Sequence, residues 1–340
     1  MSTPKSLYID RDSPIPKYRQ VANTILWEIE QEVLKKGDKL PSINEASAEF
    51  YLSRDTVEKA YRELVHRGVV SSIPGKGFFV TNRPERARLK IVLILNKLSP
   101  YKLQIHKALV EKMGEEANTT IFLHNYQARR FQSFVLDNLG LYDYYIISPH
   151  FLDDSDIASK TIEKIPPSKL ILLDKDLPNL NKGYGLIYQD YAKDITYGIQ
   201  QAKKELSKYQ QVFLVFPRNR LASTGIKSGF AKICDELGFT GQVVPSLQEL
   251  ELKKNSAYIV INEDDLLHII KSGTAKGWKS GEDYGVISYN DSPTKEILAG
   301  GVSVFSTNHA QMGIHAAEMI LKRKHQKIHN PFVWISRNSL

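Results

Sequence analysis

Four side chains near the N-terminus have the chemistry needed to read DNA. Arg54 can donate two hydrogen bonds to O6 and N7 of guanine, and Ser53 and Thr56 can bond to phosphates or bases. Lys76 lies in a Gly-Lys-Gly sequence, where small neighbours such as Gly75 allow a close approach to the DNA backbone or minor groove. A purely structural interpretation is also open, in which Ser53 only caps a helix and the glycines only form a turn.

Polar and aromatic side chains also follow the apolar runs of residues 91–340. Carboxylates and amides bond adjacent hydroxyl groups and an aromatic ring packs on a C–H face, so the set suits a polyhydroxylated ligand. Asp and Asn after a strand can instead be turn formers or helix N-caps. The candidate effector-binding residues are Tyr101, His150, Phe151, Asp174, Lys175, Arg218, Asn262, Asn290, Asp291 and Thr307.

The first eighty residues predict three helices followed by a hairpin. Apolar residues at three- and four-residue steps from Tyr18 to Val33 predict an amphipathic helix. Ser42 and Glu45 form a capping box that begins a second helix, and Ser53 caps a third. Two short strands then flank the Gly-Lys-Gly tip. This order is that of a winged helix-turn-helix, whose third helix enters the major groove by its N-terminal end.

Three segments in this region resemble the DNA-binding domain of GntR-type transcription regulators. They run from Lys36 to Ser42, from Leu52 to Val57 and from Pro74 to Val80. The resemblance covers residues 15–81 and implies that a regulator's DNA contacts come from the segment after Leu52 and from the wing tip. The implied contacts are Ser53, Arg54, Thr56, Gly75 and Lys76.

The chain departs from the GntR pattern at two places. Ile43-Asn44 stands where the family usually has Glu-Arg, and Glu58 replaces an Arg often found early in the third helix. Asn44 can still bond a phosphate, whereas Glu58 would repel one, and Lys59 can compensate from the next position. We therefore add Asn44 and Lys59 to the expected DNA-binding residues.

Apolar runs alternate with helical patterns from residue 91 onward. Continuous Val, Ile and Leu runs are typical of parallel strands buried on both faces, and repeated strand–helix units predict a two-lobed, doubly wound α/β fold. Ligands of such sheets bind beyond the carboxyl ends of the strands. The predicted strands are Ile91–Leu95, Thr120–Leu123, Tyr144–Ile147, Leu170–Leu173, Val212–Phe216, Ala257–Ile261, Tyr284–Ile287 and Val302–Phe305.

This second region resembles the effector domain of LacI-type repressors, which are similar to type I periplasmic sugar-binding proteins. The segments that carry the resemblance include 172–174, 225–230, 259–262, 284–291 and 333–339. It implies ligand contacts at Asp174, Asn262, Asn290 and Thr307. An Arg of the family is replaced by Ile226, for which Arg218 or Arg220 could supply the charge. Ser99-Pro100-Tyr101 is a variant of the family's first turn.

Composition bounds the possibilities without locating the function. The 340 residues have a formal net charge of +8, which hints at an acidic partner, but residues 1–82 contribute only +1 of it. A single Cys excludes a disulfide framework and a Cys-based zinc site. The sequence has no run of about 18 apolar residues and no evident signal peptide, so we expect a cytoplasmic protein that does not span a membrane.

The sequence predicts no enzyme, catalytic residue, metal site or cofactor, because it contains no nucleophile motif, metal-ligand cluster or correctly spaced phosphate loop. We predict a DNA-binding domain over residues 1–82, a basic linker over 83–89 and a two-lobed ligand-binding domain over 90–340. The expected function is that of a repressor that acts as a homodimer on a double-stranded DNA operator. A small effector controls it, and a sugar is the expected class of effector. Two alternatives stay open: a sugar-modifying enzyme fused to a DNA-binding domain, or a regulator whose C-terminal domain binds a protein.

Overall fold

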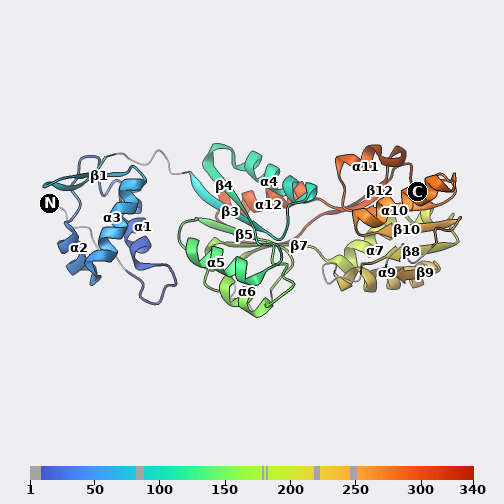
Figure 1. Cartoon of the computed structure of the whole chain (residues 1–340), viewed down its shortest axis with the longest axis horizontal. Helices are drawn as coiled ribbons and strands as arrows, with labels where there is room; N and C mark the ends of the chain where they lie inside the picture. Colours follow the sequence, from blue (N-terminus) through green and yellow to red (C-terminus); the bar gives the residue numbers. More distant parts are fainter. Residues whose placement is uncertain (1–8, 82–87, 178–179, 181–182, 218–222, 246–250) are drawn as a thin grey trace.

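The computed structural model of the chain describes residues 9–81, 88–177, 180, 183–217, 223–245 and 251–340. Three parts lie in a row along its longest axis: an N-terminal domain, then two α/β lobes that we call lobe 1 and lobe 2 (Figure 1). Among the described helices, none is long and apolar enough to cross a membrane.

The N-terminal domain consists of three helices and a β-hairpin, as the sequence predicts. They are α1 (Lys17–Glu30), α2 (Ile43–Phe50), α3 (Arg54–His66), β1 (Val70–Ile73) and β2 (Gly77–Val80). The two strands are antiparallel. One hydrophobic cluster joins α1, α2, α3 and the hairpin, so the wing is packed onto the helices.

Local hydrogen bonds fix the start of the second and third helices. Ser42 and Glu45 form the predicted capping box: the Ser42 hydroxyl accepts from the Glu45 amide at 3.2 Å, and the Glu45 carboxylate accepts from the Ser42 amide at 2.7 Å. The Ser53 hydroxyl caps α3 by accepting from the Thr56 amide at 3.3 Å. These caps orient the N-terminal end of α3.

Lobe 1 is a parallel six-stranded sheet with the strand order β13-β7-β6-β5-β3-β4. Helices α4 (Pro100–Met113) and α12 (His309–Leu321) pack on one face, and α5 (Ala128–Asn138) and α6 (Ser155–Ile162) pack on the other. The strands are β3 (Leu89–Leu95), β4 (Ala117–Leu123), β5 (Tyr144–Ile147), β6 (Leu170–Asp174), β7 (Gly185–Tyr188) and β13 (Lys327–His329).

Lobe 2 is a second six-stranded sheet, ordered β14-β12-β11-β10-β8-β9. Helices α7 (Tyr191–Gln201) and α9 (Thr224–Leu237) cover one face, and α10 (Glu263–Ala275) covers the other. A Cβ on Gly229 of α9 would lie 2.4 Å from the Ala192 carbonyl oxygen of α7, so only glycine allows these helices to approach as they do. The strands are β8 (Gln211–Val215), β9 (Gly241–Val244), β10 (Ser256–Val260), β11 (Gly285–Tyr289), β12 (Ser303–Thr307) and β14 (Phe332–Ile335).

The chain passes between the two lobes three times. It leaves lobe 1 after β7, returns after β12 to form α12, and leaves again between β13 and β14. Each lobe is therefore built from separate stretches of sequence, and the carboxyl ends of its central strands face the other lobe (Figure 1). Side chains that follow these strands are brought to one place.

The predicted fold class is confirmed, with differences at the sheet edges. All eight predicted strands are present, but the sequence interpretation missed β7, β9, β13 and β14. The edge strand β14 runs antiparallel to β12, whereas a wholly parallel sheet was expected. Most of the predicted linker, residues 83–87, lies outside the described residues, and Leu89 is already the first residue of β3.

Candidate functional sites

The N-terminal end of α3 and the tip of the wing carry the predicted DNA-binding side chains on the surface. Arg54 and Lys76 are exposed, and Thr56 is half-buried. The Ser53 hydroxyl lies 2.8 Å from the Thr56 hydroxyl and caps α3. Ser53 is also exposed, so its role as a helix cap leaves a DNA contact possible. Gly75 has a φ of +72° in the tight turn that holds Lys76 outward.

The two departures from the GntR pattern have local consequences on this surface. Glu58 pairs with Arg62 at 2.5 Å one helical turn later, so its charge is partly compensated within α3. The Lys59 ammonium lies 4.3 Å from the centre of the Tyr18 ring of α1. Asn44 is exposed near the start of α2. DNA contacts by Asn44 and Lys59 stay predictions.

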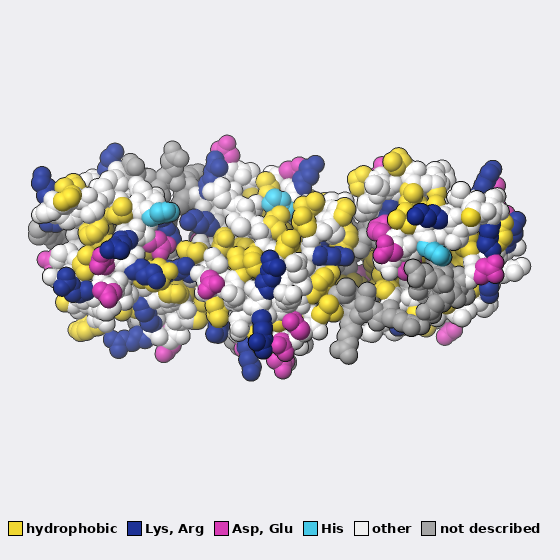
Figure 2. Space-filling view, in the orientation of Figure 1, with side chains coloured by type: hydrophobic (Ala, Val, Ile, Leu, Met, Phe, Trp, Pro, Cys, Tyr) yellow, Lys and Arg dark blue, Asp and Glu magenta, His cyan; other side chains and the backbone are white. Residues whose placement is uncertain are grey.

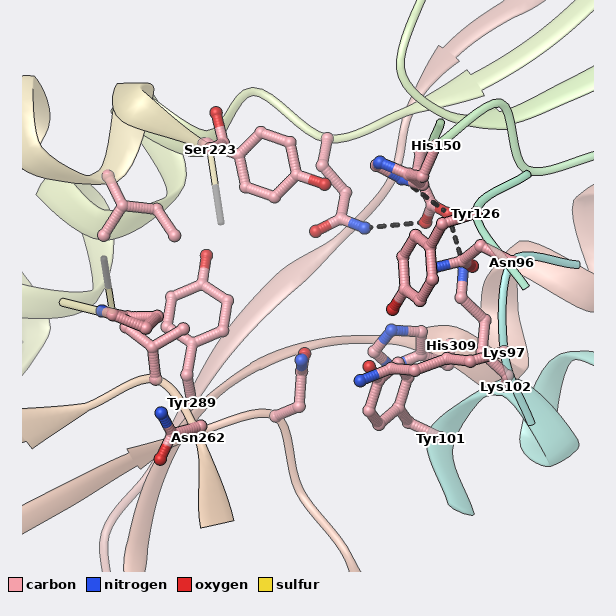
Figure 3. Close-up of a pocket in the computed structure, with 17 residues that line it drawn as sticks. Asn96, Lys97, Tyr101, Lys102, Tyr126, His150, Ser223, Asn262, Tyr289 and His309 are labelled. Atoms are coloured by element: carbon pink, nitrogen blue, oxygen red, sulfur yellow. Dashed lines mark hydrogen bonds and ion pairs between the residues drawn. The ribbon is translucent and has the colours of Figure 1, made fainter. Parts of the chain in front are cut away.

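A cavity of about 200 Å³ lies between the lobes, where strand ends of both sheets meet (Figure 3). Its lining is polar and aromatic and comes from both lobes. The lining residues are Asn96, Lys97, Tyr101, Lys102, Tyr126, His150, Asp174, Gln189, Tyr191, Pro217, Ser223, Ile226, Ile261, Asn262, Tyr289, Asn290 and His309. We call this cavity the cleft.

A hydrogen-bond network around Asp174 forms the lobe 1 wall of the cleft. The Asp174 carboxylate accepts from Lys102 and Ser148 on one oxygen and from Gln189 at 2.8 Å on the other. His150 lies 3.3 Å from the first oxygen. Burial alone would raise the pKa of Asp174, but Lys102 and His150 outweigh burial and hold this pKa well below its ordinary value. The carboxylate is therefore ionised and bonded through both of its oxygens.

Aromatic rings and neutral imidazoles line the rest of the cleft. Tyr101 packs against His309 with ring centres 4.8 Å apart. Burial lowers the pKa of His309 to about 4, so its imidazole is neutral near pH 7. Burial raises the pKa of Tyr191 and of Tyr289, so both hydroxyls stay protonated. The Tyr289 hydroxyl has no hydrogen-bond partner among the described residues.

Half of the ten predicted effector-binding residues line the cleft. They are Tyr101, His150, Asp174, Asn262 and Asn290. The Asn262 side chain also caps α10 by accepting from the Asp265 amide at 2.8 Å, as the alternative interpretation expects. Arg218 and Arg220 lie outside the described residues.

Four other predicted residues lie beside the cleft rather than in its lining. Thr307 is buried and donates to the Gln189 side chain at 2.8 Å, so it stabilises the position of Gln189 beside Asp174. Asp291 is held by both guanidinium nitrogens of Arg337 at 2.9 and 2.8 Å. Two side chains therefore have structural partners that the sequence did not indicate.

Phe151 and Lys175 are the other two predicted effector-binding residues that lie outside the cleft lining. Phe151 packs with His124 and Phe131 against the core of lobe 1, with ring centres 4.6 and 5.2 Å away. Lys175 is exposed directly after Asp174. Ligand contacts of Phe151 and Lys175 stay predictions.

The predicted effector-binding residues leave out several residues that line the cleft. Lys97 lies in the loop after β3, a position that the strand-end rule covers. Gln189 follows a strand that was not predicted, so the same rule could not find it. Lys102 and His309 lie on helices, where their sequence pattern is that of ordinary helical residues.

Charge and potential metal ligands add little to these two sites. On the face that Figure 2 shows, Lys and Arg side chains are scattered over all three parts of the molecule. Within the described ranges, no group of three or more His, Cys, Asp or Glu side chains could hold a metal ion.

Comparison with known sequences connects the N-terminal domain to bacterial regulators. Residues 17–80 match the family described as "Bacterial regulatory proteins, gntR family". The chain is 28% identical over 105 residues to the HTH-type transcriptional repressor YtrA of Bacillus subtilis. The aligned residues cover 31% of this chain and 77% of that protein. It is 36% identical over 98 residues to the mannosyl-D-glycerate transport/metabolism system repressor MngR of Escherichia coli. This alignment covers 28% of this chain and 40% of that protein.

Comparison with solved structures shows which known fold the two lobes share. The chain matches a LacI family transcriptional regulator from Enterococcus faecium that was solved with bound ribose. The TM-score is 0.61 at 14% identity, over 74% of this chain and 98% of that one. At this identity the match shows that the two chains share a fold, and it covers the part of the chain that the gntR match does not.

Proposed function

We propose that this chain, which joins a GntR-type DNA-binding domain to an effector domain of LacI-type fold, is a transcription regulator that binds its operator under the control of a sugar. The observation that carries the proposal is the cleft: its polar and aromatic lining comes from both lobes, so a ligand held there contacts both at once. A ligand of this kind favours one arrangement of the lobes over another.

Helix α3 reads the DNA operator, and the wing adds a contact to the DNA backbone. Arg54 at the start of α3 is placed to bond a base edge, while Ser53 and Thr56 bond the backbone nearby. Lys76 contacts a phosphate from the wing tip. Because a two-fold protein matches two half-sites, the regulator acts as a homodimer on a palindromic operator.

A sugar is the ligand class that the cleft suits best. Tyr101 and Tyr289 offer flat faces for the C–H side of a sugar ring, and Asn290 has a buried side-chain oxygen with no partner in the described part of the chain. The ribose bound to the related fold supports this class. The names of the related repressors support repression as the direction of control.

Operator binding titrated with sugars tests the proposal. A duplex selected from a random library by the full-length protein supplies the operator, and fluorescence anisotropy measures its affinity with and without each sugar. A sugar that binds by calorimetry and shifts operator affinity supports the mechanism, since coupling between two sites is reciprocal. A sugar that binds tightly and leaves operator affinity unchanged contradicts it. Asn290→Ala should weaken sugar binding while operator affinity without sugar stays the same.

A further inference from the structure

Lys295 is almost fully buried in lobe 2, next to the cleft. It lies in the short helix α11 (Pro293–Ile297), which follows β11, and its side chain is only 1% exposed. A buried ammonium group is costly unless it is paired and hydrogen-bonded. Lys295 is not among the residues that line the cleft. Its function therefore has to be sought in the groups that it holds.

The ammonium of Lys295 bonds three oxygens, all of them in segments that form the cleft wall. It donates to the backbone carbonyl oxygens of Tyr289 at 3.2 Å and of Asn290 at 2.6 Å, and both of these residues line the cleft. Its third partner is the carboxylate of Glu263 at 2.8 Å. Glu263 is the first residue of α10, and Asn262 directly before it also lines the cleft. One buried lysine thus ties the end of β11 to the start of α10.

The backbone of Asn290 is held from both sides. Its amide donates to the carbonyl oxygen of Phe305 in β12 at 2.7 Å, while its own carbonyl oxygen accepts from Lys295. Between these two bonds Asn290 has a φ of +61°, in the left-handed region that few residues other than glycine adopt and that asparagine tolerates. The two hydrogen bonds therefore fix the direction in which the Asn290 side chain leaves the backbone.

The side chains held in this way have polar atoms available to a ligand. The Asn290 side-chain oxygen and the Tyr289 hydroxyl are buried and have no hydrogen-bond partner in the described part of the chain. An unpaired buried polar atom costs free energy, and a ligand that bonds to it removes that cost. Figure 3 shows Tyr289 on the side of the cleft opposite His309. The end of β11 is therefore prepared to bond an effector from the lobe 2 side.

We propose that Lys295 is a positioning residue for the effector: it holds the backbone of Tyr289 and Asn290 so that their side chains bond a sugar, without touching the sugar itself. The inference rests on the proposed function, because it assumes that the cleft holds a sugar effector. Lys102 has a comparable place in lobe 1, where it is buried on α4 and bonds the Asp174 carboxylate. A buried lysine on a helix thus organises each wall of the cleft.

Substitution of Lys295 tests the assigned role. Calorimetry on the full-length protein, with ribose, glucose, galactose and lactose as probes, first identifies a sugar that binds. Lys295→Met has a side chain of similar length that cannot donate, so it should weaken binding of that sugar about 10- to 100-fold. Lys295→Arg, which still donates to carbonyl and carboxylate oxygens, should recover part of the loss. Operator affinity without sugar should stay near its original value in both variants, because Lys295 lies outside the DNA-binding domain.

A double-mutant cycle separates positioning from general stability. If Lys295 acts through Asn290, Lys295→Met should weaken sugar binding much less in an Asn290→Ala background than in the original chain. Two losses that multiply independently would overturn the proposal. Ile233→Ala is the stability control, because it removes a buried side chain of α9 in the core of lobe 2, outside the cleft lining. It should lower stability and leave sugar affinity unchanged, and a loss as large as that of Lys295→Met would also overturn the proposal.

Glu263→Gln provides the same test if Lys295→Met does not fold, which circular dichroism shows. The Glu263 side chain is 63% exposed, so this variant leaves the core intact while it removes the counter-charge of Lys295. It should weaken sugar binding about 3- to 10-fold in the original chain and less in the Asn290→Ala background. An unchanged sugar affinity in Glu263→Gln would then overturn the role of Lys295.

The possible outcomes separate this inference from the proposed function. If a sugar binds and shifts operator affinity, but Lys295→Met binds it as tightly as the original chain does, the role of Lys295 is overturned while the sugar-controlled regulator stands. If no sugar of the panel binds while the operator is still bound, both the inference and the sugar control under Proposed function fail.

Discussion

The guanidinium of Arg19 in α1 donates a hydrogen bond of 2.9 Å to the carbonyl oxygen of Leu139, the residue after α5 of lobe 1. Arg19 is only 9% exposed. The last carbonyl groups of a helix carry partial negative charge, so a buried cation at this end is favourable. The DNA-binding domain is therefore docked on lobe 1 as well as joined to it by the chain.

Neighbouring contacts make this docking specific. Asn23 donates to the Gly140 carbonyl oxygen at 3.2 Å, and Ile15 packs against the hydrophobic core of lobe 1. Gly140 has a φ of +85°, and a Cβ there would lie 2.8 Å from the Ile15 side chain. The end of α5 and the start of α1 thus have complementary surfaces. We therefore expect a movement of lobe 1 to move the DNA-binding domain with it.

Removing the Arg19 contact should uncouple the effector from the operator. Because Arg19 does not line the cleft and is not one of the expected DNA-binding residues, Arg19→Met should leave effector affinity and operator affinity near their original values. The effector-induced change in operator affinity, typically about 5- to 150-fold in allosteric proteins, should shrink toward onefold. Anisotropy titrations with and without effector measure it.

Arg129→Ala is the control for this uncoupling. Arg129 lies on the same helix α5 but is mostly exposed and pairs with Asp154, so its loss leaves the interface intact. An undiminished effector response in Arg19→Met would show that the docking contact does not transmit the signal.

Arg54→Ala should weaken operator binding by roughly 1–3 kcal/mol and relax the preference at one base position. The physical reason is the loss of a bidentate contact to a base edge, which random DNA does not offer. Lys76→Ala is the comparison: a phosphate contact carries no sequence information, so all duplexes should weaken and the salt dependence should fall by about one ion. Equal losses on operator and random DNA for Arg54→Ala would exclude base reading.

Signals that lie within a few residues could be predicted from the sequence. Ser42 and Glu45 are three residues apart and cap each other, and the Gly-Lys-Gly tip lies between two paired strands. Buried parallel strands were equally visible, because both faces need apolar side chains. The positions after those strands then indicated five of the cleft residues.

Features that depend on distant partners could not be predicted. The sequence around Lys102 predicts an exposed helical lysine. Lys102 is buried instead, because it bonds to Ser148 and Asp174, which lie 46 and 72 residues away. Asp291 reads as a ligand residue, yet it is held by Arg337, 46 residues later. Short strands such as β13 have no pattern of their own and form only because β7 is beside them.

Lys102→Met should destabilise lobe 1 by about 3–5 kcal/mol, because it leaves the buried carboxylate of Asp174 without its main counter-charge. Urea unfolding followed by circular dichroism measures the loss. The double variant Lys102→Met/Asp174→Leu should recover part of this stability, since it removes both charges. A double variant as unstable as the sum of both single variants would contradict the pairing.

Stability should fall as the pH drops from 7.5 to 5.5, partly because two imidazoles are buried. Burial is the main reason that the pKa values of His124 and His309 are lowered to about 4, against an ordinary value near 6.5. Between those values the unfolded chain binds more protons than the folded one, so acid favours unfolding. Each imidazole should cost about 1.4 kcal/mol at pH 5.5 and nothing well above pH 6.5.

Substituting one imidazole isolates its effect from groups that titrate in the opposite sense. Burial raises the pKa of Asp194 to about 6, so this carboxyl takes up a proton in the folded state and favours folding as the pH falls. His124→Gln cannot protonate, and its stability loss between pH 7.5 and 5.5 should therefore be smaller than that of the original chain by about 1.4 kcal/mol. His66→Gln, which removes an exposed imidazole from α3, is the matched control. Urea unfolding at the two pH values decides: the same pH dependence in His124→Gln and in the original chain would mean that the buried imidazole is protonated without cost.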